Sequence, residues 1–368
     1  MKKLIALLMA MVMVLSLAAC GGSSSNSGGE TAPAEASAAA EASAASGEFN
    51  PDTAEDAMTI EQLREANGAV VPVKSGTKLG VVMKSLSNEF WRTLEEGYEA
   101  AKGEAGVDIQ VSATTDEGDE TGQQTMTSDF VNQGVDALLM SPISDSNLTN
   151  AVEDANNADI VTVNVNDGLI AQADQYIGPN AYMNGQLAAE WMSNKLGDKG
   201  QVAIVIGMAK AFAARERTAG FKDWLTEKNS GMELVAEQNA DWDRQRAKEV
   251  ATTWIQQYPD LKGIFCNNDD MALGVVEAVR ESGSDILVVG VDGIGEAYES
   301  IRNGGLDATI DSFPYYMSQV AVECTLRALA GQELPSVIAT PQALIDSENV
   351  DKDAAEIIHW IAPNYTAQ

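Results

Sequence analysis

Aromatic, amide and charged side chains follow directly after the short apolar runs of this sequence. They are Lys84, Asn88, Phe90, Trp91, Asn166, Asp167, Arg215, Trp242, Asn268 and Asp292. Aromatic faces stack on C–H groups, and a hydroxyl, which is both donor and acceptor, is well served by carboxylate and amide partners. A cleft lined by this set has the chemistry that a sugar ring needs.

Several of these residues also have a purely structural interpretation. Phe90 and Trp91 could pack in a core at a helix start, but adjacent residues cannot both face one core, so contact with a ligand is favoured. Trp242 could plug a loop instead of stacking on a ring. Arg215 could belong to a surface charge pattern with Arg217; because residues i and i+2 of a helix point apart, only one of the two can face a cleft.

Other motifs argue against an enzyme, a metal or a cofactor. Asp269 and Asp270 lack the further spaced oxygen ligands of a calcium loop and are expected to cap the helix that begins near Met271. The glycines of residues 290–295 do not follow the dinucleotide-binding order. The only histidine, His359, lies far along the chain from every cleft motif, so neither a histidine triad nor a histidine zinc site can be built.

The elements that position these side chains alternate regularly along the chain. Apolar, β-branched runs predict strands over residues 79–83, 109–113, 137–140, 160–165, 202–206, 234–236, 263–266, 286–291 and 308–310. Between them, apolar residues at three- and four-residue spacing predict helices, for example over residues 90–105, 183–195, 217–228, 247–258, 271–282 and 316–330. Buried strands separated by amphipathic helices indicate an α/β fold with parallel sheets covered on both faces, and ligands of such folds bind at the carboxyl ends of the strands.

The first residues indicate export. Lys2 and Lys3 precede an apolar run from Leu4 to Leu17 that is shorter than the ~20 residues of a membrane span, which predicts a signal peptide over residues 1–19. Residues 17–20, Leu-Ala-Ala-Cys, resemble a lipobox, in which Cys20 would be diacylated. We therefore expect residues 20–75 to form a lipidated cysteine and a flexible tether, rich at first in Gly, Ser and Ala. A helical pattern near residues 59–64 is compatible with packing on the body or with staying loose.

Composition restricts the partners. The formal charge of −32 repels nucleic acid and anionic lipid surfaces. Because about 290 residues remain after the tether, two domains are expected. Cys266 and Cys324 do not constitute a disulfide framework; two buried thiols are favoured over a single bridge.

Four motifs in one order carry a family resemblance. They are residues 87–91 (Ser-Asn-Glu-Phe-Trp), 213–217 (Ala-Ala-Arg-Glu-Arg), 267–274 (Asn-Asn-Asp-Asp-Met-Ala-Leu-Gly) and 289–293 (Val-Gly-Val-Asp-Gly). Together they resemble the ribose-binding-protein-like group of periplasmic sugar-binding proteins, from Leu79 to about Val350.

The resemblance implies two Rossmann-like lobes joined by three chain crossings, with the ligand between them. The lobes would comprise residues 76–178 plus 312–344 and residues 179–311 plus 345–368, with crossings near residues 178–179, 311–312 and 344–346. Asn88, Arg215, Asn268 and Asp292 would bind hydroxyls, and Phe90, Trp91 and Trp242 would sandwich the ring. The implied function is a monomeric, lipid-anchored extracytoplasmic protein that passes a monosaccharide or polyol to an ABC transporter permease.

Three positions depart from the ribose-binding pattern. Lys84 replaces a small hydroxyl residue, Asn166 and Asp167 replace Asp-Arg, and Ser312 replaces a hinge glutamine. Lys84 and Asp167 could form an ion pair or share the hydroxyls of a sugar other than ribose. A sensor that presents its closed form to a membrane kinase or chemoreceptor would use the same fold and cleft, and the sequence does not separate it from a transport protein.

Overall fold

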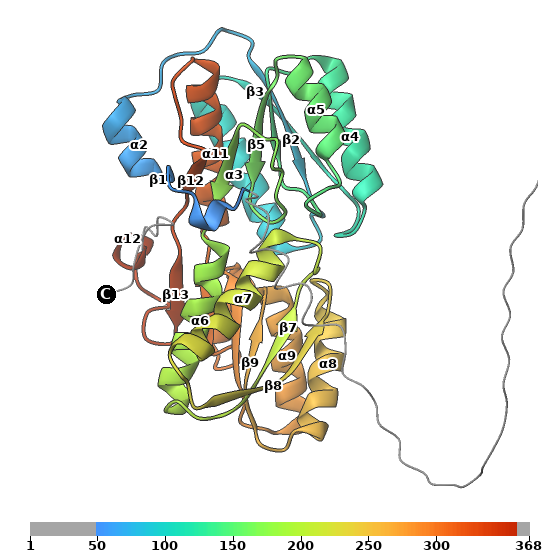
Figure 1. Cartoon of the computed structure of the whole chain (residues 1–368), viewed down its shortest axis with the longest axis vertical. Helices are drawn as coiled ribbons and strands as arrows, with labels where there is room; N and C mark the ends of the chain where they lie inside the picture. The colour runs from blue at the N-terminus through green and yellow to red at the C-terminus, as the bar shows by residue number, and fades with distance from the viewer. Residues whose placement is uncertain (1–48, 359–368) are drawn as a thin grey trace, which may run out of the picture. The chain divides into compact units, whose positions relative to one another are not determined.

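The computed structural model describes residues 49–358, apart from the side chain of Glu104. The predicted signal peptide, Cys20, the first part of the tether and His359 lie outside the described residues. Among the residues described, strands and helices alternate along nearly the whole chain and build two sheets (Figure 1).

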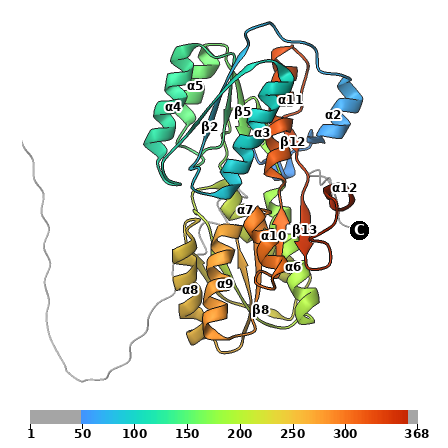
Figure 2. The same cartoon turned by 180° about the vertical axis from the view of Figure 1, so that it is seen from behind.

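The first sheet has seven strands in the order β1-β12-β6-β5-β4-β2-β3, and all neighbouring pairs are parallel. The strands are β1 (Met58–Thr59), β2 (Lys78–Met83), β3 (Asp108–Ala113), β4 (Ala137–Met140), β5 (Val161–Val165), β6 (Gln175–Gly178) and β12 (Val337–Ala339). On one face lie α4 (Glu120–Gln133) and α5 (Thr149–Asn157), and on the other lie α3 (Glu89–Ala105) and α11 (Pro314–Leu329) (Figures 1 and 2).

The second sheet has six strands in the order β13-β11-β10-β9-β7-β8, of which only β13 runs antiparallel to its neighbour. The strands are β7 (Gly200–Ile206), β8 (Met232–Asn239), β9 (Leu261–Cys266), β10 (Leu287–Asp292), β11 (Ala308–Asp311) and β13 (Ala343–Asp346). The helices α6 (Ala181–Leu196) and α7 (Phe212–Glu227) pack on one face; α8 (Arg244–Gln257) and α9 (Asp269–Ser282) pack on the other, with α10 (Gly295–Arg302) beside α9.

Buried apolar strands explain why these sheets form where they do. Every residue of β4 is buried, and so is each residue of β2 after Lys78, because helices cover both faces of the sheet. Phe221 of α7 and Phe265 of β9 stack with ring centroids 5.0 Å apart in the second core. Each sheet with its helices forms one lobe, and the predicted two-lobed α/β fold is confirmed.

The chain passes between the two sheets after β6, after β11 and after β12. The third passage lies between Ala339 and Ala343, whereas the sequence placed it near residues 344–346, which form β13 in the second sheet. A short helix, α12 (Ala354–Ile357), follows this strand.

Residues 49–75 are part of the fold, although the sequence assigned them to the tether. The 3₁₀ helix η1 (Pro51–Thr53) is followed by β1 and by α2 (Ile60–Asn67), whose Ile60 and Leu63 are buried. Arg64 of α2 forms an ion pair with Glu323 of α11, 2.6 Å between Nη2 and Oε2. The helical pattern in this segment therefore marks a helix that packs on the first lobe.

Cys266 and Cys324 are buried and unlinked, and burial raises the pKa of both thiols. Within residues 49–358, no helix is long and apolar enough to span a bilayer. The same residues contain no cluster of three or more acidic, histidine or cysteine side chains placed to hold a metal ion.

Candidate ligand-binding site

A cavity lies between the carboxyl edges of the two sheets, with about 300 Å³ of empty space that includes open solvent at its mouth. The first lobe lines it with Asn88, Phe90, Trp91, Glu117, Asn166 and Asp167, and the second with Arg217, Trp242, Asn268 and Asp292. Eight of the residues expected from the sequence therefore meet at one place.

The start of α3 brings the first-lobe aromatics into the cavity. Asn88 caps this helix, since its Oδ1 accepts from the backbone N–H of Phe90 at 2.9 Å. The rings of Phe90 and Trp91 meet edge to face, with centroids 4.9 Å apart. Trp91 donates from Nε1 to Glu117 Oε1 at 3.0 Å, which fixes the indole plane. Glu117, in the loop after β3, was not singled out from the sequence.

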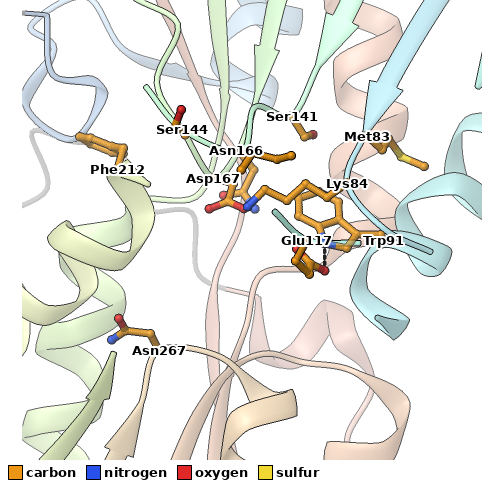
Figure 3. Close-up of polar contacts among 12 residues, drawn as sticks. Met83, Lys84, Trp91, Glu117, Ser141, Ser144, Asn166, Asp167, Phe212 and Asn267 are labelled. Carbon is orange, nitrogen blue, oxygen red and sulfur yellow. Dashed lines mark hydrogen bonds and ion pairs between the residues drawn. The ribbon is translucent and has the colours of Figure 1, made fainter. Parts of the chain in front are cut away.

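Lys84 forms a buried ion pair with Asp167 at the inner end of the cavity. Figure 3 shows the Lys84 side chain extended between Asp167 and the ring of Trp91. Its Nζ lies 5.7 Å from the ring centroid of Trp91 and 5.7 Å from that of Trp242, one tryptophan from each lobe. Lys84 does not itself line the cavity but lies behind residues that do.

Unusual backbone conformations aim several of these side chains. Asn166 and Asp167 have φ of 54° and 66°, and Trp242 has φ of 66°, in the left-handed region that non-glycine residues rarely adopt. Asn164 holds the first of these turns by donating to the carbonyl oxygens of Asn166 and Gly168 at 3.3 and 3.1 Å. Such strain concentrates at functional sites and persists only where surrounding contacts enforce it.

Gly207, at the end of β7, makes room for the indole of Trp242. A Cβ atom at this position would lie 2.2 Å from the Trp242 ring. The absence of a side chain thus lets the ring lie close to the backbone, where it forms one wall of the cavity. This glycine is a steric requirement of the site.

The structure places Arg217, and not Arg215, against the cavity. Arg217 is buried and donates from Nη1 to the carbonyl of Asn267 at 2.5 Å, and this atom lies 3.4 Å from Asp292 Oδ1. Arg215 is 42% exposed and pairs with Asp145 at 2.5 Å. The sequence analysis required that only one arginine face the cleft and chose Arg215 by resemblance. In the structure Arg217 lines the cavity, and the phase of α7 turns Arg215 toward the rim.

The loops after β9 and β10 supply the remaining polar groups. Asn268 caps α9, accepting from the N–H of Met271 at 3.0 Å, so the expected cap is this amide and not Asp269 or Asp270. Asp269 instead holds the loop after β10, accepting from the N–H groups of Gly293 and Ile294 at 2.8 and 3.1 Å. Ser312, also expected in the site, is buried beside the cavity but does not line it.

Several polar atoms around the cavity have no hydrogen-bond partner within the described part of the chain. They are Asn166 Oδ1, Asp167 Oδ1, Arg217 Nε, Trp242 Nε1 and, nearby, Ser312 Oγ. A buried polar group without a partner is costly, and native structures rarely retain one without a functional reason. Donors and acceptors are thus offered together beside indole faces, the arrangement that a polyhydroxylated ring requires.

Burial changes the ionisation of two cavity carboxyls. It raises the pKa of Glu117 to about 7, although the nearby positive charge of Lys84 acts in the opposite direction. Burial also raises the pKa of Asp292 well above its ordinary value, again partly offset by the charge of Arg217. These groups can bind hydroxyls either as acceptors or, when protonated, as donors.

Contacts between the lobes close the cavity. Glu89 of the first lobe accepts from the N–H groups of Gly295 and Glu296, which begin α10, at 3.1 and 3.2 Å. Lys210 of the second lobe pairs with Glu120 of the first at 2.6 Å. With the Arg215–Asp145 pair, these contacts hold the lobes together outside the cavity, so the structure represents a closed arrangement.

Residues 79–333 match the family model of the periplasmic binding protein domain. The chain belongs to this family. It is 32% identical to the ribose import binding protein of Bacillus subtilis over 278 residues, covering 74% of this chain and 90% of that protein. It is 33% identical to the D-allose-binding periplasmic protein of Escherichia coli over 285 residues, covering 74% and 91%.

Solved structures of the family agree with the fold. A periplasmic solute-binding protein of an ABC transporter from Actinobacillus succinogenes, with bound D-allose, is 28% identical with a TM-score of 0.72, covering 75% of this chain and all of that one. A solute-binding protein from Bacillus halodurans, with bound myo-inositol, is 25% identical with a TM-score of 0.71, covering 77% and 99%. The resemblance drawn from the four sequence motifs is confirmed.

Proposed function

We propose that this chain is an extracytoplasmic solute-binding protein that captures a monosaccharide or polyol between its lobes and delivers it to an ABC importer. The observation that carries the proposal is the cavity between the lobes, where indole faces of Trp91 and Trp242 stand beside buried polar atoms without partners. Relatives whose names specify ribose or D-allose import and binding support this class of solute.

The proposed roles follow from position. The aromatic side chains that stack on the ring are Phe90, Trp91 and Trp242. The polar side chains that bind its hydroxyls are Asn88, Asn166, Asp167, Asn268 and Asp292. To this set inferred from the sequence, the lining of the cavity adds Arg217 and Glu117. Lys84 orients Asp167 through their ion pair. Ser312 acts from the hinge, where its N–H donates to the carbonyl of Asp292 at 3.1 Å.

The proposed attachment to the membrane rests on the sequence alone. Cys20 would carry the lipid and hold a monomer at the extracytoplasmic face of the cell membrane, next to the permease. The charge of −32 favours solubility at that surface.

Thermal unfolding in the presence of single solutes tests the function. The probes are D-ribose, D-allose, D-fucose, myo-inositol and glycerol, with L-alanine and citrate as solutes of other classes. A ligand at a hundred times its dissociation constant should stabilise the fold by about 2.7 kcal/mol. We expect a sugar or cyclitol to raise the unfolding midpoint and the amino acid and the carboxylate to leave it unchanged. Stabilisation only by the amino acid or the carboxylate would overturn the proposal. An unchanged midpoint with every member of a wider panel of sugars and polyols would also overturn it.

A further inference from the structure

Residues 49–57, here called the hinge strap, lie at the junction of the two lobes. Figure 1 shows this blue segment, which precedes α2, crossing at the level where the chain passes from one lobe to the other. It lies before residue 79, where the family match begins, so the known domain does not account for it.

The strap is bonded to the second lobe through Asp52. This carboxylate is 5% exposed and accepts from the N–H groups of Ala181 and Tyr182 at 3.0 and 2.8 Å. These are the first residues of α6, directly after the first passage between the lobes. Asn180 Nδ2 also donates to the carbonyl of Asp52 at 3.3 Å. Asp52 thus satisfies two backbone donors that the helix itself leaves open.

The same segment is bonded to the first lobe through Asp56. Its two carboxylate oxygens accept from the backbone N–H and the hydroxyl of Ser336, both at 2.6 Å. Ser336 directly precedes β12, with which β1 then pairs in parallel. One short segment therefore holds both lobes through carboxyl oxygens that accept hydrogen bonds.

An apolar cluster joins the strap to both lobes as well. Ala57 is buried in this cluster, and Phe49 and Ala54 pack against it. Its other members are Leu169, Tyr176 and Val337 of the first lobe and Ala181, Phe212 and Ala213 of the second. The rings of Tyr176 and Phe212 meet across the junction, with centroids 6.4 Å apart. A rotation of one lobe against the other would separate these groups.

The strap is also connected, through Asn180, to two of the three passages between the lobes. Gln342, in the third passage, accepts from the N–H of Asn180 at 2.9 Å and donates to its carbonyl at 3.0 Å. Asn180 is the residue that donates to Asp52, so the first and third passages and the strap form one network. Burial raises the pKa of Asp52 to about 7, a sign of how completely water is excluded from this network.

We propose that the hinge strap biases the two lobes toward their closed arrangement, because only there are its contacts to both lobes made together. The strap does not touch the cavity, so it acts on the population of closed molecules and not on contacts with the solute. When the population of closed molecules falls, the affinity for a solute that binds the closed arrangement falls by the same factor.

Distances between spin labels test this in the absence of any solute. Cysteines placed at the exposed Asp129 of α4 and Glu249 of α8, in a Cys20→Ser background, carry the labels, since Cys266 and Cys324 are buried. We expect the strap-intact protein to populate a short distance and Asp52→Ala to shift the distribution to longer values. Asp56→Ala, at an exposed position, should give the same shift to a smaller degree.

A matched control is Asp136→Ala, which removes a carboxylate that accepts from the N–H of Lys78 at 2.9 Å, at the start of β2 and away from the junction. If Asp52→Ala does not fold, the distance distribution of Asp56→Ala alone tests the proposal. Unchanged distances in folded strap variants would overturn the proposal, as would a fully open strap-intact protein. Since no sugar is present, neither result depends on the proposed solute.

Discussion

Lys84 and Asp167 pair beside the cavity from the loops that follow two strands that are not neighbours, β2 and β5, with β4 between them. Their side chains are 0% and 9% exposed. The indole rings of Trp91 and Trp242 flank the ammonium group from opposite lobes. The pair therefore connects the floor of the cavity to both of its aromatic walls.

Replacing Lys84 with Ser should weaken sugar binding and destabilise the fold. Loss of one partner of a buried ion pair leaves an uncompensated charge, which costs about 3–5 kcal/mol. In a double-mutant cycle with Asp167→Asn, we expect a coupling energy of ~0.5–3 kcal/mol in calorimetric binding measurements. Lys222→Ser, which breaks an exposed pair with Glu237, is the control. Additive losses would show that the pair does not act as a unit.

Arg217→Gln should reduce affinity at least tenfold, since its buried guanidinium lines the cavity beside Asp292. Arg215→Gln should change affinity less than about fivefold, because an exposed ion pair contributes ~0–1 kcal/mol. Isothermal titration of the two variants compares them directly. The opposite ranking would restore Arg215 as the arginine that binds the solute.

Asp292→Ala and Asn268→Ala should each weaken binding by ~1–3 kcal/mol, as expected when a buried hydroxyl loses its partner. Asn268 also caps α9, so its replacement by Ala should lower thermal stability as well. Asn268→Asp keeps an oxygen that can cap the helix and replaces the amide donor with a carboxylate oxygen, so it tests the donor without loss of the cap. Unchanged dissociation constants for all three variants would contradict the proposed cavity.

Asp311, at the second passage between the lobes, should make the fold more stable at low pH. Burial raises its pKa from 3.8 to about 7, although the N–H of Phe313 and the hydroxyl of Tyr298 donate to it. The folded state therefore binds this proton more tightly than the unfolded chain. Its contribution is complete below about pH 4 and is lost as the pH rises to about 7.

Asp311→Asn removes this titrating group. Between pH 4 and 7, the free energy of unfolding in urea should therefore fall less for the variant than for the unaltered protein. Each unit of pKa difference corresponds to about 1.4 kcal/mol. Parallel pH profiles for the two proteins would mean that folding does not raise the pKa of Asp311.

Cys20→Ala should release the protein from the membrane fraction into the aqueous one, since it removes the acceptor of the proposed lipid. Mass spectrometry of the mature N-terminus measures the modification directly. An unmodified terminal residue in the unaltered protein would refute the anchor.

The long strands and helices could be predicted because each carries its own periodic signal. All nine apolar runs found in the sequence are strands, but the short strands β1, β6, β12 and β13, of two to four residues, were missed. Their strand character comes from neighbours distant in the chain, such as the pairing of β1 with β12.

The sequence placed those residues of the candidate site whose position depends on local sequence patterns. Residues that follow strands meet at one edge, which is why eight of them line the cavity. The choice between Arg215 and Arg217 depends on the rotation of α7 about its axis, which packing on α6 sets and the local sequence does not. Glu117 lies in a polar loop whose composition resembles that of any solvated loop; its position in the loop after a strand was the signal available.

The positive φ angles of Asn166, Asp167 and Trp242 limit any attempt to redesign the specificity of this protein. At the first two positions, asparagine, aspartate and glycine are the residues that adopt such a backbone at low cost, so a saturation library there would mostly yield destabilised variants. Phe90, within a helix, carries no such restriction. The solute specificity should therefore be easier to change by altering the size of the side chain at Phe90 than by replacing Asn166 or Asp167.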